Sequence, residues 1–202
     1  MRRCKSGGLY GFDKKICKDY EYTAGVDEAG RGPLAGPVVA SAVILPKKFL
    51  IKGIADSKAI NQNKREKAFK EISEHALAIG FGVCDRKKID SINIFNASYL
   101  AMKIAVKKLK IKPNLILVDG PYKIPGIKTS QKAIIGGDAK SACIAAASII
   151  SKVKRDRIMS NYDKKFPQYG FKKHKGYPTK EHRNAIKRHG VTKIHRLSFN
   201  MG

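Results

Sequence analysis

The chain has 202 residues and carries 42 lysines and arginines against 16 aspartates and glutamates, a formal net charge of +26 at pH 7. Hydrophobic residues make up 43% of it, which is enough for a buried core and excludes a wholly disordered protein. A surface this basic favours a polyanionic partner, with nucleic acid a stronger candidate than an anionic membrane. The alternative is that the lysines only keep the protein in solution.

Cysteines stand at positions 4, 17, 84 and 143, without a CxxC pair or a spacing typical of a zinc knuckle. Cysteines scattered in this way indicate buried or idle thiols in a reducing compartment. No apolar stretch follows the charged N-terminus, so no signal peptide is visible, and the longest apolar runs are too short to span a bilayer. The sequence therefore predicts a soluble cytoplasmic protein with no membrane partner.

The hydrophobic patterns predict alternating strands and helices. Strands are expected where short apolar or β-branched runs end in turn residues, at 22–26, 38–45, 79–83, 115–118 and 133–135. Helices are expected where apolar residues recur every three or four positions, at 61–77, from 92 to just before Pro113, at 139–159 and near 179–189. The first two strands are joined by a short loop, which favours antiparallel neighbours. This order predicts an α/β domain with a mixed sheet.

Composition divides the chain into three regions. Residues 1–20 have no clear periodicity and are expected to be a loosely held N-terminal extension. Residues 21–160 contain the predicted sheet and form the main domain. Residues 161–202 hold 11 lysines and arginines but only 2 acids, which predicts a basic helical region that binds the substrate.

Four acids stand at the ends of predicted elements. Asp27 and Glu28 end the first strand, Asp119 ends another, and Asp138 opens the alanine-rich helix. These are the places where α/β sheets bind their ligands. Each acid also has a plainer interpretation, the first three as turn residues and Asp138 as a helix N-cap. Because three termini of one sheet each carry an acid beside glycines, a shared site is favoured.

Clustered carboxylates repel one another, and divalent cations remove that cost. Oxygen ligands suit Mg²⁺ or Mn²⁺, whereas the lack of a Cys/His cluster disfavours zinc. Two such ions about 4 Å apart can activate a water and stabilise a leaving oxygen in phosphoryl transfer. Since adjacent strand residues point to opposite faces, Asp27 and Glu28 are expected to share a site only if the strand breaks there, which Gly30 and Gly32 allow.

Basic and polar residues outside this cluster have two interpretations each. The loop 29–33, AGRGP, either lets the backbone approach a sugar or phosphate closely or is an ordinary tight turn. Four of the five histidines follow residue 160 and are interpreted as phosphate-contacting or surface residues rather than zinc ligands. Four basic residues of the last long helix are either a solvated face or phosphate contacts: Lys152, Lys154, Arg155 and Arg157.

Together these motifs resemble the ribonuclease HII family. The run AGVDEAGRGPLAGPV at 24–38 is similar to the family's first signature, and DSK at 56–58, VDG at 118–120 and GGD at 136–138 resemble further elements. The resemblance continues through AASI and KVKRD at 146–156, HKGYPT at 174–179 and HRLSF at 195–199. It covers about residues 22–199.

The resemblance implies an RNase H-like mixed sheet flanked by helices, with a small C-terminal helical region. It implies an endonuclease that cuts 5′ of ribonucleotides in RNA–DNA hybrids and of single ribonucleotides embedded in duplex DNA. The products would carry 3′-hydroxyl and 5′-phosphate ends, as in primer removal and ribonucleotide excision. Asp27, Glu28, Asp119 and Asp138 would be the catalytic residues and would hold two Mg²⁺ or Mn²⁺ ions.

The substrate contacts are implied by the same resemblance. The backbone of Gly30, Arg31 and Gly32 would contact the ribose 2′-hydroxyl, which distinguishes RNA from DNA, and the adjacent phosphate. Ser57 and Lys58 would contact phosphates, and Tyr177 would pack on the sugar that follows the ribonucleotide.

Two rival functions remain for comparison. The related ribonuclease HIII type prefers longer RNA and carries an additional N-terminal domain, for which the 20 residues before the first signature leave no room. A non-catalytic basic nucleic-acid-binding protein would share the charge but has no need of four acids at strand and helix ends. A replication sliding clamp is a candidate partner, although the C-terminus shows no clear clamp-binding motif, and a monomer is the default oligomeric state.

Overall fold

A computed structural model describes residues 8–47 and 61–201, and its centre is a five-stranded sheet in the order β3-β2-β1-β4-β5. The strands are β1 (Thr23–Ala29), β2 (Val38–Ile44), β3 (Ala78–Cys84), β4 (Leu115–Asp119) and β5 (Ser130–Ile134). β1 pairs antiparallel with β2 and parallel with β4, and β4 pairs parallel with β5. The predicted mixed sheet and its antiparallel first pair are therefore confirmed.

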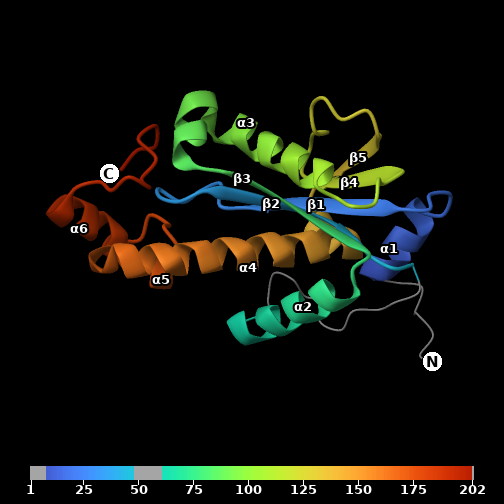
Figure 1. Ribbon diagram of the computed structural model, residues 1–202, viewed down its shortest axis with the longest axis horizontal. Helices are drawn as coiled ribbons and strands as arrows, with labels where there is room; N and C mark the ends of the chain where they lie inside the picture. The colour runs from blue at the N-terminus through green and yellow to red at the C-terminus, as the bar shows by residue number, and fades with distance from the viewer. Residues whose placement is uncertain (1–7, 48–60, 202) are drawn as a thin grey trace.

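Helices cover both faces of this sheet. They are α1 (Leu9–Ile16), α2 (Gln62–His75), α3 (Arg86–Lys107), α4 (Ala142–Lys165), α5 (Phe171–His174) and α6 (Lys180–His189). Figure 1 shows α3 on one face, α4 on the other, and α2 on the outer side of α4. The C-terminal helices lie at the opposite end of the sheet from α1.

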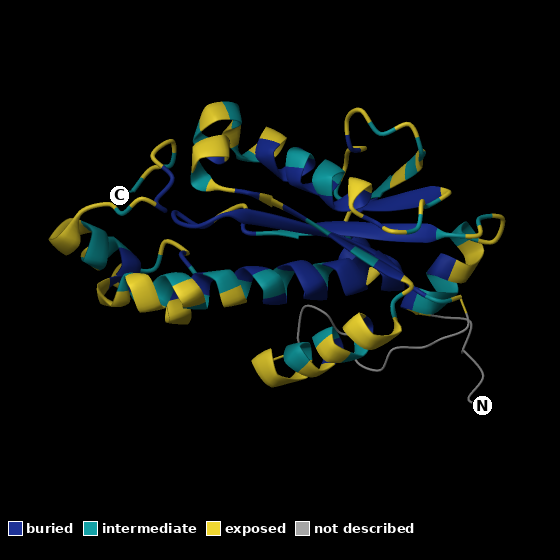
Figure 2. Ribbon diagram, viewed as in Figure 1, coloured by how far each residue is buried: buried dark blue, intermediate teal, exposed yellow. Residues whose placement is uncertain are grey.

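Small residues allow α3 and α4 to lie close against the sheet. Gly80 and Gly82 of β3 face the carbonyls of Ala105 and Ala101 in α3, with which an added Cβ would collide. Gly25 of β1 meets the main chain of α4 in the same way. Figure 2 shows the result, since the strands and the inner side of α4 are buried while α2 is largely exposed.

Several element boundaries differ from the prediction, and β1 runs to Ala29 rather than 26. α3 begins six residues earlier than expected, at Arg86, and breaks at Asn93, which has a φ of 61°. The helix expected from residue 92 therefore corresponds to the second segment, whose first turn donates the N–H of Asn96 to the Asn93 side chain. β5 ends at Ile134 rather than 135 and starts at Ser130. α4 begins at Ala142 because the glycines before it form a separate 3₁₀ turn at Gly137–Ala139.

The N-terminal segment is not a loosely held extension in the part that the structure describes. α1 buries Leu9 in the cluster of apolar residues beneath α4. Asp13 is also buried, and its Oδ2 accepts the N–H of Cys143 at 2.9 Å in the first turn of α4. An eight-residue helix gives a weak periodic signal, and the partner of Asp13 lies 130 residues away, so the sequence pattern does not reveal this contact.

We expect Asp13→Ala to lower the free energy of unfolding by about 1 kcal/mol, because the N–H of Cys143 loses its acceptor at a helix N-terminus. Urea denaturation followed by circular dichroism measures the change. Lys14→Ala, at the exposed neighbouring position of α1, is the matched control. Equal midpoints for both variants and the parent chain would contradict the anchoring role of α1.

The expected boundary at residue 160 lies inside α4, which continues to Lys165. The residues beyond it pack around a separate apolar cluster made by Ala35, Met159, Tyr169, Phe171 and Ile194. The C-terminal region is therefore joined to the sheet by one continuous helix and by the loop that contains Ala35.

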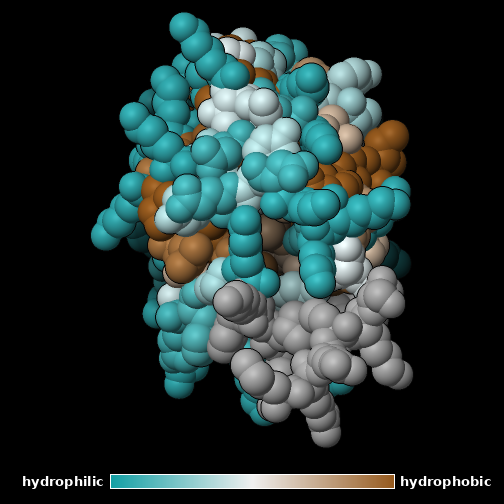
Figure 3. Space-filling view, turned by 90° about the vertical axis from the view of Figure 1, so that its right-hand side faces the viewer, coloured by the Kyte–Doolittle hydropathy of each residue, from teal (hydrophilic) through white to brown (hydrophobic). Residues whose placement is uncertain are grey.

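No helix among the described residues is both long and apolar enough to cross a membrane. The end of the molecule shown in Figure 3 carries mainly hydrophilic side chains, with hydrophobic patches between them.

Candidate active site

The parallel pairing of β1 and β4 brings two predicted acids together. Val26 is paired with Val118, so Asp27 and Asp119 are the next residues at the carboxyl ends of neighbouring strands. Asp27 is buried, and its Oδ1 accepts the N–H of Glu28 at 2.7 Å. Burial raises the pKa of Asp27 well above its ordinary value, and the charges of Glu28 and Asp119 raise it further.

Glu28 shares this site although the strand does not break before it. β1 continues to Ala29, so the expected break between Asp27 and Glu28 is absent. β4 ends at Asp119, which leaves the last two residues of β1 without a parallel neighbour and gives Glu28 room beside Asp119. Burial raises the pKa of Glu28; the Arg31 guanidinium, 3.4 Å away, opposes this rise and the Asp119 charge adds to it.

Asp138 lies in the 3₁₀ turn before α4, next to the residue that hydrogen-bonds to Asp119. The N-cap of α4 is Ser141, whose hydroxyl accepts the N–H of Ile144, so the plain interpretation of Asp138 as the cap of that helix is wrong. Asp138 is buried, and the N–H of the adjacent Gly137 donates to Asp119 Oδ1 at 2.6 Å. This bond ties the turn to the end of β4.

These four carboxylates supply hard oxygen ligands of the kind that Mg²⁺ and Mn²⁺ prefer. Across residues 8–47 and 61–201, no three His, Cys, Asp or Glu side chains already converge on one point, and Glu28 and Asp119 instead meet protein donors. Burial raises the pKa of Asp27 and Glu28, and the charge of Asp119 adds to the rise in both, so it is costly to hold these carboxylates ionised in this arrangement. A divalent cation would relieve that cost, so the donor set fits such an ion.

A cavity of about 400 Å³ opens beside the acids. Its lining brings Glu28 together with four predicted substrate contacts, Gly30, Arg31, Gly32 and Tyr177. The Tyr177 ring is partly exposed, and Lys152 Nζ lies 5.9 Å from its centroid. The predicted residues Ser57 and Lys58 lie outside the described residues.

Five residues of this cavity are not among the predicted site residues: Ala29, Arg65, Ser148, Ile149 and Lys152. Ser148 of α4 lines it and hydrogen-bonds to Asp27, and Arg65 lines it from the first turn of α2. Ser148 stands in the AASI motif, which is a usable signal in the sequence. Arg65 stands on a helix whose pattern indicates only an exposed amphipathic face, so nothing in the sequence singles it out.

The interpretation of the C-terminal histidines as surface or phosphate-contacting residues is wrong for three of the four. His174, His182 and His195 are buried. The rings of His174 and His182 stack with centroids 4.4 Å apart, and Nε2 of His182 lies 3.1 Å from Nε2 of His195. Only His189 is exposed, and the buried three form a structural cluster with Tyr169 and Phe171.

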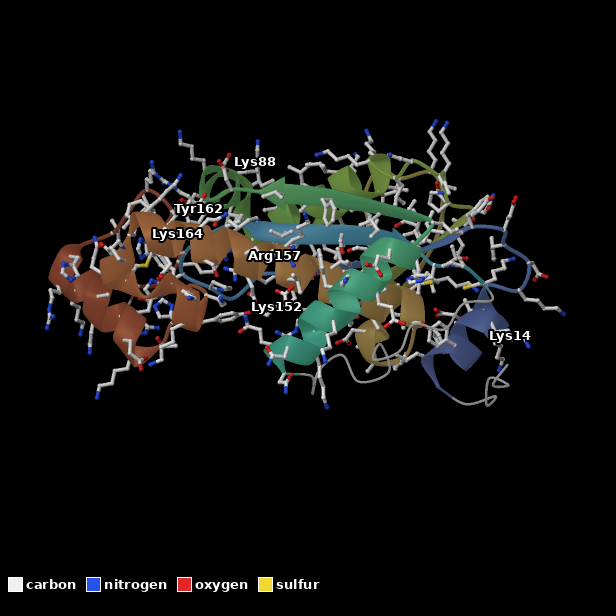
Figure 4. All side chains as sticks on the ribbon, turned by 60° about the horizontal axis from the view of Figure 1, so that its bottom comes forward. Lys14, Lys88, Lys152, Arg157, Tyr162 and Lys164 are labelled. Atoms are coloured by element: carbon white, nitrogen blue, oxygen red, sulfur yellow. The ribbon has the colours of Figure 1, made fainter. Side chains whose placement is uncertain are left out.

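The four basic residues of α4 do not share one role. Arg155 is fully buried and donates to main-chain carbonyls, which neither a solvated face nor a phosphate contact describes. Lys152 is paired with Asp156 at 2.7 Å, Arg157 with Glu66 at 2.7 Å, and Lys154 lies over the ring of Phe81. Figure 4 shows Lys152, Arg157 and Lys164 along α4 among many other lysine side chains that project outwards.

Comparison with known proteins identifies the family. The ribonuclease HII family model matches residues 24–201. Ribonuclease HII of Acetivibrio thermocellus is 54% identical over 182 residues, 90% of this chain and 71% of that protein. Ribonuclease HII of Endomicrobium trichonymphae is 52% identical over 95% of this chain and 91% of its own length.

Solved structures also match this fold. RNase HII from Archaeoglobus fulgidus, solved in a complex with PCNA, matches with a TM-score of 0.74 and 26% identity over 89% of this chain and 95% of that one. The predicted RNase H-like fold is therefore confirmed. With its acids at the ends of β1 and β4 and its similarity to these relatives over 90% or more of its own length, the chain belongs to the ribonuclease HII family and is an endonuclease that cleaves the RNA of RNA–DNA hybrids.

Proposed function

We propose that the chain cuts the phosphodiester bond on the 5′ side of a ribonucleotide, both in hybrids and at single ribonucleotides embedded in duplex DNA. The products would carry 3′-hydroxyl and 5′-phosphate ends, which suits primer removal and ribonucleotide excision. The observation that carries this proposal is the shared cavity of Glu28, residues 30–32 and Tyr177. Its volume of about 400 Å³ lies in the range of sites that bind one small molecule, which supports recognition of a single nucleotide.

Asp27, Glu28, Asp119 and Asp138 are proposed as the catalytic residues and as the ligands of two Mg²⁺ or Mn²⁺ ions. Such ions, when bound, lower the pKa of an attacking water and stabilise the leaving oxygen. Hydrogen bonds within the protein fix the positions of two of these side chains. The Glu28 N–H and Ser148 fix Asp27, and the Gly137 N–H fixes Asp119.

Gly30, Arg31 and Gly32 are proposed to contact the ribose 2′-hydroxyl and the adjacent phosphate through their backbone. The Arg31 side chain is 48% exposed, so its guanidinium is also available to a phosphate. Residues 161–202 are proposed as the basic region that binds the rest of the duplex, and Ser57 and Lys58 as phosphate contacts. A non-catalytic nucleic-acid-binding protein, the rival function, does not fit membership of an endonuclease family.

The decisive experiment uses an end-labelled DNA duplex that contains one ribonucleotide, incubated with Mg²⁺, Mn²⁺ or EDTA. We expect a nick 5′ of the ribonucleotide in either metal and none in EDTA. A duplex of the same sequence without the ribonucleotide is the control. Cleavage of long hybrids without cleavage of the single-ribonucleotide duplex would refute the proposed substrate range.

We expect Tyr177→Ala to lower the cleavage rate at a single embedded ribonucleotide by about tenfold, because the sugar loses its stacking surface at a contact worth about 1–3 kcal/mol. The change should be smaller on a long hybrid, where any ribonucleotide can enter the site. Tyr177→Phe keeps the ring and is the matched control. Unchanged single-ribonucleotide rates in the alanine variant would contradict the proposed contact.

A replication sliding clamp is proposed as a protein partner, on the single ground that the A. fulgidus relative was solved in complex with PCNA. The free chain is proposed to be a monomer in the cytoplasm. Gel filtration of the chain with and without a clamp tests both statements about assembly, since a clamp complex must elute earlier than either component.

A further inference from the structure

Two arginines are the largest fully buried side chains of the described residues, Arg155 of α4 and Arg196 of the C-terminal segment. No ion pair with an acid reaches either guanidinium within residues 8–47 and 61–201. Burial, and after it the charge of Arg155, lowers the pKa of Arg196 to about 9. Since burying an unpaired charge is costly, these side chains need a specific explanation.

Arg196 binds the loop that holds the predicted ribonucleotide contacts. Its Nη2 donates to the carbonyl of Gly30 at 2.6 Å, its Nη1 to the carbonyl of Arg31 at 2.9 Å, and its Nε to the carbonyl of Gly36 at 2.9 Å. The planar guanidinium donates to the three carbonyls from three separate nitrogens. The three donors of a lysine share one nitrogen, and a glutamine has only two donors.

Arg155 holds the far side of the same loop. It donates to the carbonyls of Ala35 and Pro37, and its third bond goes to Lys175, two residues before Tyr177. The main chain adds to this docking, because Gly36 and Leu34 exchange hydrogen bonds with Ile194 and Arg196. Figure 1 shows the C-terminal segment beside this loop at one end of the sheet.

Peptide geometry gives these bonds a consequence for substrate recognition. In a trans peptide unit, a carbonyl that points one way turns the N–H of the next residue the opposite way. When Arg196 draws the carbonyls of Gly30 and Arg31 inwards, the N–H groups of Arg31 and Gly32 turn outwards. Both residues line the cavity beside Glu28, and outward N–H groups bind phosphate and hydroxyl oxygens.

We propose that Arg196 is a positioning residue, which fixes residues 30–32 in the conformation that presents the N–H groups of Arg31 and Gly32 to the ribonucleotide. The inference rests on the proposed function, because it assigns a support to the proposed 2′-hydroxyl contacts.

The test compares binding of two duplexes of identical sequence, one with a single ribonucleotide and one all-DNA, in EDTA. We expect Arg196→Lys to lower the ratio of these two affinities by about tenfold while all-DNA binding stays as in the parent chain. Asp13→Ala, a destabilised variant far from this loop, is the control and should keep the ratio. Both variants are measured at a temperature at which circular dichroism shows them to be folded.

Other outcomes overturn the inference. If Arg196→Lys keeps the parent ratio, or loses affinity equally for both duplexes, Arg196 only supports the fold. If the parent chain itself binds both duplexes equally, the proposed recognition of a ribonucleotide fails first, and the inference fails with it. If Arg196→Lys does not fold, a measurement on the parent chain takes its place. NMR couplings are then measured across the hydrogen bonds from the Arg196 guanidinium to the carbonyls of Gly30 and Arg31. These must persist when the ribonucleotide duplex is added, and their loss would refute the role.

Discussion

Asp119→Asn is expected to reduce cleavage by more than about a hundredfold, leave duplex binding intact, and raise the free energy of unfolding. The loss follows from the position of Asp119, which faces Asp27 across β1 and β4 and is a proposed ligand of the ions. Substitutions of residues that merely support metal ligands cost 10–100-fold, so the loss of a ligand should exceed this range.

The rise in stability follows from the charge that the substitution removes. Asp119 raises the pKa of both Asp27 and Glu28, so the three negative charges destabilise one another in the absence of a cation. Asparagine keeps an oxygen that can accept the Gly137 N–H, now 2.6 Å from Asp119 Oδ1, and therefore preserves the local structure. The free energy of unfolding should therefore rise, because the substitution removes one of these mutually repelling charges.

Three measurements check this prediction: cleavage of the single-ribonucleotide duplex in Mg²⁺ and Mn²⁺, affinity for that duplex in EDTA, and urea denaturation in EDTA. Glu74→Gln, which removes an equal charge from the exposed side of α2, is the control for net charge. Near-normal turnover of Asp119→Asn, or a loss of stability, would refute the assignment.

The positions of the acids near the ends of β1 and β4 could be predicted because local signals mark them, while their catalytic role stays a proposal. β1 and β4 are short apolar runs that end at Asp27-Glu28 and Asp119, and their parallel pairing then places these acids side by side. Asp138 follows two glycines before a helix. The residues next to each acid in the sequence are enough to mark it, and the pairing of the strands then brings the acids close together.

The support of the site could not be predicted in the same way. Arg196 and Gly30 are 166 residues apart, and Arg155 is surrounded in sequence by exposed basic residues from which its pattern does not distinguish it. Arg155 is buried because loop 30–37 and the C-terminal segment pack against α4, and this packing is a property of the tertiary structure. The same reason explains the histidines, whose partners are backbone groups of loops with no periodic pattern.

The buried histidines should make the fold sensitive to mild acid, because the hydrogen bonds of the cluster require neutral rings. The N–H of Thr192 donates to Nδ1 of His195 at 2.8 Å, so the proton of His195 is at Nε2 and is donated to Nε2 of His182 at 3.1 Å. His182 therefore carries its own proton at Nδ1 and donates it to the carbonyl of Tyr177 at 2.9 Å. A proton added at Nδ1 of His195 would meet the N–H of Thr192 and leave only the Thr192 hydroxyl oxygen, at 2.9 Å, as an acceptor. A proton added at Nε2 of His182 would meet the N–H of His195, so either proton disrupts this series of hydrogen bonds.

Burial, and after it the charge of the neighbouring His182, lowers the pKa of His195 from 6.5 to about 4. Burial also lowers the pKa of His182. Between pH 6.5 and 4 the unfolded chain thus binds a proton that the folded chain does not. The stabilisation from a neutral His195 is complete above pH 6.5 and is lost as the pH falls towards 4, by about 3 kcal/mol in all.

The carboxylates act in the opposite direction, because the raised pKa values of Asp27 and Glu28 make folding take up protons in mild acid. The informative quantity is therefore the difference in free energy of unfolding between the parent chain and His195→Gln at each pH from 7 to 4. We expect the variant to be less stable at pH 7, since it loses the acceptor for Thr192, and the difference to shrink as the pH falls. His189→Gln makes the same change at the exposed histidine and should show a constant difference near zero. If the difference in free energy of unfolding between His195→Gln and the parent chain stays constant with pH, His195 is not held neutral. That result would refute the series of hydrogen bonds from Thr192 to Tyr177.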